Sequence, residues 1–231
     1  MPVKRPEAGA NLAQMLPGEA GPIEAILQAP RDAVARPGIA VICHPHPLAG
    51  GAMSNKLTWM LASAALRVGL LAVRFNFRGV GRSAGAHDNG RGERADTERV
   101  AATLRELEPD GPLLLAGFSF GADVAIAAAQ ALSPTALVTV APPLHYLDAP
   151  AAWRGPECPW QLLHARDDDV VPYERTQQRL AAYERSPEIV SFDTGGHFFH
   201  GSVNTLRDAV MPFLQARLGA CLLYTSPSPR D

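Results

Sequence analysis

The sequence has few of the features that mark secreted, membrane or nucleic-acid-binding proteins. It contains three cysteines in 231 residues, without the spacing of a disulfide framework or a metal site. Its formal charge is -2 and its acidic and basic residues are interspersed, so no basic stripe predicts a nucleic-acid partner. Its apolar runs are too short to span a bilayer. We therefore expect neither nucleic acid nor a membrane among its partners.

The first twenty residues also lack the continuous apolar stretch of a secretory signal. They hold Lys4, Arg5, three prolines and two glutamates. Together with the low cysteine content, this predicts a cytoplasmic protein. A chain of 231 residues, 47% of them apolar, suits one domain with a sizeable core, in which Cys43 is expected to be an inert thiol. The sequence does not determine the oligomeric state, and a homodimer is one possibility.

What the chain does contain is a strand–turn–helix pattern over residues 113–132. A short apolar strand leads into Gly117-Phe-Ser119-Phe-Gly121, and an alanine-rich helix follows. In this context a serine is held on a tight turn, with its Oγ above the sheet edge and its N–H beside the helix N-terminus. The two glycines avoid side chains that would obstruct the reversal. The alternative is a glycine turn in an ordinary strand–helix unit.

Strands alternate with helices along the rest of the chain. This predicts an α/β fold: one domain with a mostly parallel, doubly wound sheet, helices on both faces and no internal repeat. We expect Ser54 to cap the first helix and Gly69 to end it. Besides the strand and helix on either side of the Gly117–Gly121 turn, the predicted strands are 23–28, 39–43, 70–75, 136–140, 160–164 and 188–192, and the predicted helices are 55–68, 92–107, 173–183 and about 202–218.

A nucleophilic serine needs a base and an acid, and in this kind of fold the chain order is Ser, then Asp or Glu, then His. Three carboxylates, Asp167 to Asp169, follow the strand 160–164. Asp168 is predicted to be the acid because it lies four residues after His164 and four before Pro172. Asp167 and Asp169 are interpreted as solvated loop charges, with Asp169 helping to cap the next helix.

The predicted base is His197, which follows the strand 188–192 behind two glycines. The alternatives are that it is a polar loop histidine, or that His200 is the base. His200 is disfavoured because three more residues carry it toward the final helix.

An oxyanion hole should complete the site, with the backbone N–H of Phe120 as one donor. The second donor should come from the loop after the strand 39–43. Pro45 and Pro47 have no N–H, so His46 and Leu48 remain, and His46 is favoured. A metal pair at His44 and His46 is the competing interpretation, but no third ligand is evident nearby. We expect no metal.

Several motifs carry a resemblance to a known family. They are His44-Pro-His-Pro-Leu-Ala-Gly-Gly51, Arg74-Phe-Asn-Phe-Arg-Gly-Val-Gly-Arg-Ser83, Asp88-Asn-Gly90, Ala116-Gly-Phe-Ser-Phe-Gly121 and Gly196-His-Phe-Phe-His-Gly201. From about Met15 to Leu218, the chain resembles a compact bacterial group of the α/β-hydrolase superfamily. That group is described as predicted serine hydrolases or esterases related to dienelactone hydrolases.

The resemblance implies a catalytic triad of Ser119, Asp168 and His197 and no cofactor. Two features depart from the family pattern: Ala165 stands where a glycine is usual, and the acid loop has an extra-acidic run. Three further polar residues of the motifs are expected to form a loop-stabilising network rather than to line the pocket; they are Arg78, Arg82 and Asp88.

The connection between Val140 and Trp160 is too short for the cap domain that this superfamily often inserts there. We therefore expect an open, shallow site. Four apolar residues could form an acyl-side wall or pack a short helix on the sheet; they are Leu144, Tyr146, Leu147 and Trp153.

The leading functional hypothesis is a carboxylesterase-like serine hydrolase acting on a small-molecule ester. Two alternatives stay open. One is a small peptidase or acyltransferase with the same triad, and the other is a non-catalytic binding module on a hydrolase scaffold.

The last eleven residues, Cys221 to Asp231, break the preceding helical pattern and are rich in proline and small polar residues. They resemble the in-frame translation of a transposase sequencing adapter; the alternative is a genuine disordered tail. We therefore predict a hydrolase domain over 1–220 and a non-native, disordered tail over 221–231.

Overall fold

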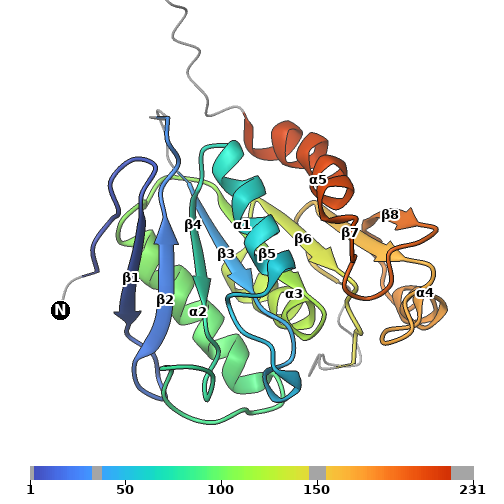
Figure 1. The fold of residues 1–231 in the computed structure, drawn as a ribbon, viewed down its shortest axis with the longest axis horizontal. Helices are drawn as coiled ribbons and strands as arrows, with labels where there is room; N and C mark the ends of the chain where they lie inside the picture. Colours follow the sequence, from blue (N-terminus) through green and yellow to red (C-terminus); the bar gives the residue numbers. More distant parts are fainter. Residues whose placement is uncertain (1–2, 33–37, 146–154, 220–231) are drawn as a thin grey trace, which may run out of the picture.

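The computed structural model describes residues 3–32, 38–145 and 155–219. Within these ranges, eight strands form one sheet in the order β1-β2-β4-β3-β5-β6-β7-β8 (Figure 1). β1 and β2 pair antiparallel, β2 also runs antiparallel to β4, and the remaining neighbours are parallel. The strands are β1 Asn11–Leu16, β2 Ile23–Gln28, β3 Ile39–Cys43, β4 Leu71–Phe75, β5 Leu113–Phe118, β6 Ala136–Val140, β7 Trp160–Ala165 and β8 Glu188–Phe192.

Helices cover both faces of the sheet and enclose two apolar cores. α2 and α3 pack on one face, and α1 and α5 pack on the other. Their bounds are α1 Lys56–Arg67, α2 Arg91–Arg105, α3 Phe120–Leu132, α4 Tyr173–Leu180 and α5 Val203–Leu218, with a 3₁₀ turn, η1, at Pro47–Ala49. The predicted α/β fold class is therefore confirmed. Within the described ranges, no helix is both long and apolar enough to cross a membrane.

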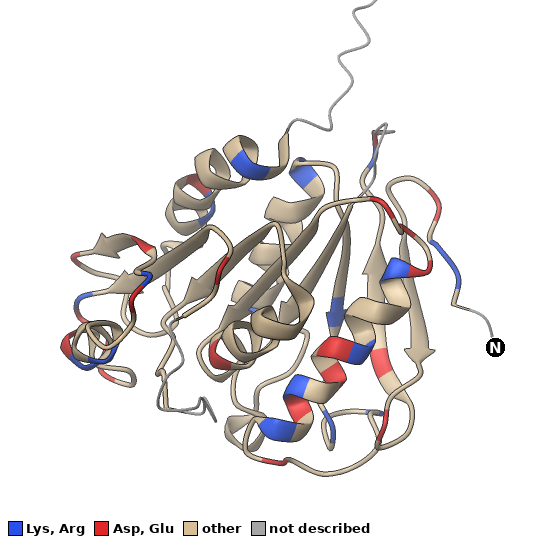
Figure 2. Cartoon of the chain, turned by 180° about the vertical axis from the view of Figure 1, so that it is seen from behind, with Lys and Arg blue, Asp and Glu red and all other residues tan. Residues whose placement is uncertain are grey.

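The central strands lie in the apolar core, and charged residues are found on the helices that cover them. The central strands β3 to β7 are buried at every position because helices cover both faces of the sheet. Cys43 is fully buried in this core, and burial raises the pKa of its thiol to about 12, against the lowering effect of a contact with Thr97. Charged residues of both signs lie along α2 (Figure 2).

The structure corrects the predicted start of α1. The N-cap is Asn55 rather than Ser54, and its Oδ1 accepts hydrogen bonds from the N–H groups of Leu57 at 2.9 Å and Thr58 at 3.4 Å. Serine and asparagine cap helices about equally well, so the local sequence does not decide between neighbours. Gly69 follows the helix end with φ +83°, as expected for a residue that terminates it.

The sequence analysis missed β1, the edge strand. It pairs with β2 over its full length, from Asn11 opposite Gln28 to Leu16 opposite Ile23. Its polar residues give it no continuous apolar run, and its position depends on hydrogen bonds to a strand that comes later in the chain.

The parallel strands β3 to β8 all point their carboxyl ends toward one edge of the sheet (Figure 1). The loops that follow β3, β5, β7 and β8 carry the residues expected to act, and the loop after β4 lies beside them. This edge is where doubly wound sheets place their ligands.

The predicted tail, Cys221 to Asp231, lies outside the described residues. α5 ends at Leu218, after burying Leu206, Val210 and Leu214 against the sheet. We predict that truncation after Ala220 leaves the melting temperature and any esterase activity unchanged, because α5 has completed its apolar contacts before the tail begins. Thermal unfolding and ester turnover of the two forms provide the measurement. A marked fall in melting temperature on truncation would show that the tail belongs to the fold.

Candidate active site

Ser119 lies in the sharp turn between β5 and α3. Its backbone takes φ +54° and ψ −123°, which L-residues rarely adopt, and its N–H donates to Val140 O at 2.8 Å. A Cβ at Gly117 would clash with the backbone of Gly121, and a Cβ at Gly121 would clash with the backbone of His44. The two glycines of the motif are therefore needed for strand, turn and helix to approach this closely.

The structure brings Ser119, His197 and Asp168 together from three loops. The Nε2 of His197 lies 3.1 Å from Ser119 Oγ, and its Nδ1 lies 2.8 Å from Asp168 Oδ2. The exposed fractions are 8% for Ser119 and 4% for each of the other two. Because Nδ1 faces a carboxylate, it carries the proton, and Nε2 is left to accept a hydrogen bond from the serine hydroxyl.

The carboxylate of Asp168 is surrounded by donors. Its Oδ1 accepts from the N–H of Val170 at 3.0 Å and of Val171 at 2.7 Å. Burial alone would raise the pKa of Asp168, but hydrogen bonds from His164, His197 and Val171 hold it well below its usual range. The group is therefore an anion that can stabilise a protonated His197.

The neighbouring aspartates differ from their predicted roles. Asp169 does not cap α4, whose N-cap is Pro172, without a side-chain hydrogen bond. Asp167 is exposed, but it is more than a solvated charge, since its carboxylate accepts from the N–H groups of Gly195 at 3.2 Å and Gly196 at 2.8 Å. It thereby ties the acid loop to the loop that carries the histidine.

His200, the alternative base, is exposed and directed toward α1. Its Nδ1 lies 2.9 Å from the Nζ of Lys56, whereas Nε2 of His197 lies within hydrogen-bond distance of Ser119 Oγ.

The loop after β3 lies next to the elbow. The ring of His46 packs against that of Phe120 with centroids 5.0 Å apart. Of the two predicted second donors, the N–H of Leu48 already donates to His46 Nδ1 at 3.2 Å in the 3₁₀ turn.

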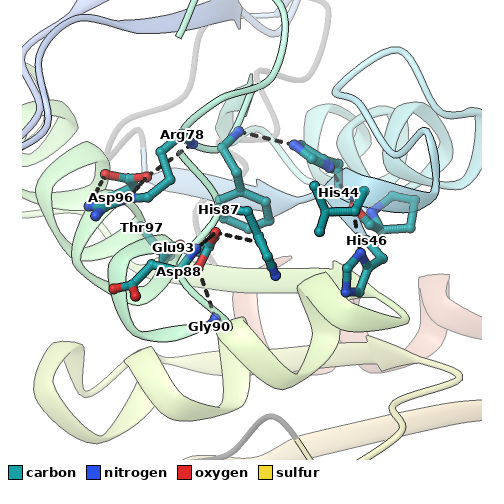
Figure 3. Close-up of polar contacts among 12 residues, drawn as sticks. His44, His46, Arg78, His87, Asp88, Gly90, Glu93, Asp96 and Thr97 are labelled. Carbon is teal, nitrogen blue, oxygen red and sulfur yellow. Dashed lines mark hydrogen bonds and ion pairs between the residues drawn. The ribbon is translucent and has the colours of Figure 1, made fainter. Parts of the chain in front are cut away.

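His44 has a structural role, because it connects the loops after β3 and β4 through hydrogen bonds to the backbone. It is fully buried, its Nε2 accepts from the N–H of Phe77 at 3.0 Å, and its Nδ1 faces Pro45 O at 2.7 Å (Figure 3). Burial lowers the pKa of His44 to about 4. Both of its nitrogens are thus engaged with backbone groups, which disfavours the metal-pair interpretation. Across the described ranges, no three His, Cys, Asp or Glu side chains are arranged to hold a metal ion.

A network that the sequence only partly predicts fixes the loop after β4 (Figure 3). Arg78 makes a two-pronged salt bridge with buried Asp96 of α2, with Nε–Oδ2 at 3.0 Å and Nη2–Oδ1 at 2.8 Å. The predicted loop-stabilising role is confirmed for Arg78. Arg82 and Asp88 join through their backbone: the Arg82 N–H donates to Glu24 Oε2 at 2.8 Å, and the Asp88 N–H donates to Glu93 Oε1 at 2.9 Å.

Glu93 and His87 are the members of this network that the sequence analysis missed. Glu93 is fully buried, accepts from the N–H of Gly90 at 2.8 Å, and lies 2.9 Å from Nδ1 of His87. The His87 ring in turn lies 4.9 Å from that of His46 and 5.4 Å from that of Phe120. Glu93, His87 and His46 thus lie next to one another beside the predicted oxyanion donors.

Of the residues predicted to form an acyl-side wall, only Leu144 is described, since Tyr146, Leu147 and Trp153 lie outside the described residues. Leu144 is 7% exposed and belongs to the core. Its N–H donates at 2.8 Å to Oδ1 of Asp123, a buried carboxylate in the first turn of α3.

No protein-family model matches the chain. Over 89 residues it is 42% identical to an uncharacterized protein of Rickettsia prowazekii, a match that spans 38% of this chain and only 37% of that protein. A solved α/β serine hydrolase without a lid, from Xanthomonas campestris, is 36% identical with a TM-score of 0.81, covering 92% of this chain and 96% of that one.

A second solved structure, an α/β serine hydrolase homologue from Coxiella burnetii, is 34% identical with a TM-score of 0.83 and covers 91% of this chain and 100% of its own. A dienelactone hydrolase from Anabaena variabilis shares the fold at 16% identity and a TM-score of 0.74, covering 90% of this chain and 98% of its own.

Proposed function

Because the chain belongs to the α/β-hydrolase superfamily, we propose that it is a serine hydrolase that cleaves small acyl esters with Ser119, His197 and Asp168. The observation that carries this proposal is the continuous hydrogen-bonded path from Ser119 Oγ through both nitrogens of His197 to Asp168. Three side chains from three loops meet here in the chain order of a catalytic triad and with hydrogen bonds that suit its proposed roles.

In the proposed reaction, Ser119 Oγ attacks the acyl carbonyl carbon while His197 Nε2 accepts its proton. The resulting imidazolium is stabilised by the Asp168 anion. The imidazolium of His197 then gives its proton to the departing alkoxide as the tetrahedral intermediate collapses to the acyl-enzyme. Water then attacks the carbonyl carbon of the acyl-enzyme while His197 Nε2 takes its proton. The bond between this carbon and Ser119 Oγ breaks, the carboxylic acid leaves, and Oγ takes the proton back from His197.

The negative oxygen of the tetrahedral intermediate is proposed to bind the backbone N–H groups of Phe120 and His46. Phe120 is the first residue of α3, so the positive end of the helix dipole adds to its hydrogen bond. The 3₁₀ turn that follows His46, with Pro47 in its first turn, and the packing of His46 on Phe120 would hold the second donor in place before substrate binds.

The test combines an active-site probe with a panel of substrates. A fluorophosphonate should label the wild-type protein at Ser119, and p-nitrophenyl esters of short acids should be cleaved faster than matched amides. A preference for amides would instead support the peptidase alternative. Failure of Ser119 to react with the probe would support a non-catalytic binding module.

The dependence of the rate on pH is a further prediction. The base must be neutral, so kcat/KM should rise with pH through a single histidine-type transition. Asp168 should add no second transition in this range, because its lowered pKa keeps it ionised throughout. A pH profile of ester hydrolysis provides the measurement. A flat profile from acid to alkali, with acyl transfer shown to be rate-limiting, would contradict a histidine base.

A further inference from the structure

A second histidine contacts the proposed acid, at the same carboxylate oxygen as His197. His164, near the end of β7, is fully buried, and its Nε2 lies 2.9 Å from Val171 O and 3.2 Å from Asp168 Oδ2. With the donors from Val170, Val171 and His197, four N–H groups then surround the two oxygens of one carboxylate. A carboxylate has about four lone-pair positions, so this set satisfies it completely.

The surroundings of His164 determine which nitrogen carries the proton. Nε2 faces two oxygen acceptors, so it must be the N–H, shared between Val171 O and Asp168 Oδ2. Nδ1 is buried, and within the described residues it has no hydrogen-bond partner. A proton on Nδ1 would bury an unsatisfied donor. The geometry therefore selects the neutral Nε2–H form, a one-proton donor aimed at the acid loop.

We propose that His164 is a positioning residue for the triad, holding Asp168 in the orientation that faces His197. This assignment rests on the proposed function. His164 acts directly, through its N–H near Oδ2, and also through Val171, whose carbonyl it fixes and whose N–H donates to Oδ1. His164 thus holds Oδ2 of the acid directly and Oδ1 through Val171.

Electrostatics support the same role. The hydrogen bond from His164 is the largest of the effects that hold the pKa of Asp168 below its usual range against the opposing effect of burial. Two further ionisable groups lie nearby: the Tyr173 ring is edge-on to the His164 ring with centroids 5.4 Å apart, and the Arg166 guanidinium lies 5.2 Å from the Tyr173 ring. His164 is thus the side chain besides His197 that controls how strongly Asp168 attracts a proton.

The experiment compares two substitutions that differ in the donor. His164→Phe keeps a ring against Tyr173 but removes the N–H, whereas His164→Gln places an amide N–H near the position of Nε2. Thr139→Val is the matched control, since Thr139 is a fully buried, hydrogen-bonded residue on the adjacent strand β6 and lies outside the acid loop.

We expect kcat for a p-nitrophenyl ester to fall about tenfold in His164→Phe, with KM little changed, because a hydrogen bond to a charged group is lost. His164→Gln should recover most of this loss. The midpoint of the pH profile should rise by about half a unit in His164→Phe, because a carboxylate with fewer donors holds the imidazolium proton more tightly. In His164→Gln and Thr139→Val the midpoint should stay at the wild-type value.

A histidine-selective ¹⁵N NMR titration of His197 reads the same midpoint without any substrate. The result is therefore independent of whether the protein hydrolyses esters, while loss of turnover in Ser119→Ala tests the proposed function separately. If His164→Phe does not fold, His164→Asn takes its place, because its shorter amide cannot reach Asp168. A midpoint that stays or falls in the variant without the donor, or that moves equally in His164→Gln, would overturn the assignment.

Discussion

Replacing Ser119 by alanine should abolish ester turnover while leaving the fold intact. The members of a triad act as a unit, so removal of the nucleophile should cost about six decades in kcat. The fold should persist because alanine keeps the Cβ, so the substitution introduces no new clash at φ +54°. Only the hydrogen bond between Oγ and His197 Nε2 is lost. The measurement is hydrolysis of a p-nitrophenyl ester by purified protein whose circular dichroism and melting temperature match the wild type.

Ser133→Ala is the control for this substitution. Ser133 also has a positive φ, +45°, and it caps the opposite end of the same helix, α3. Its loss should affect stability at most and leave turnover unchanged. Undiminished hydrolysis by folded Ser119→Ala would exclude Ser119 as the nucleophile and, with it, the proposed mechanism.

The parallel strands could be predicted because their signal is local. β3 and β6 are short apolar runs bounded by turn residues, and their observed ends coincide with the predicted ones. β1 could not be found in this way, because it is an edge strand with polar residues and depends on pairing with β2. The first residue of α1 was wrong by one position for a similar reason, since the choice between Ser54 and Asn55 depends on tertiary geometry.

The meeting of Ser119 with His197, 78 positions apart, could be anticipated from chain order and strand ends. The buried carboxylates Glu93 and Asp96 could not. In the sequence they belong to a charged amphipathic helix, where acidic residues are usually solvated. Their burial requires Arg78 and the rest of the loop after β4 to arrive from another part of the chain. Such a partner is visible only in three dimensions.

Substitution of the acid should have the second-largest effect on turnover. Asp168→Asn is expected to lower kcat by about four decades, as in other triads, because it permits the wrong histidine tautomer. An amide N–H facing His197 Nδ1 would leave that nitrogen unprotonated and move the proton to Nε2, which could then no longer accept the hydrogen of Ser119 Oγ. The amide oxygen would keep the position of Oδ1 and still accept from the N–H groups of Val170 and Val171, so the substitution acts on the side of the carboxylate that faces His197.

The same substitution in the two neighbouring aspartates tests the assignment within the acid loop. Asp169 is exposed, and the hydrogen bonds of Asp167 to Gly195 and Gly196 lie at the surface, where water can replace them. Asp167→Asn and Asp169→Asn should therefore each lower kcat by less than about one decade. Steady-state kinetics of the three variants on one ester provide the comparison. If Asp169→Asn is the crippling change instead, the acid is one residue later than proposed, and His164 and His197 do not converge on the carboxylate that matters.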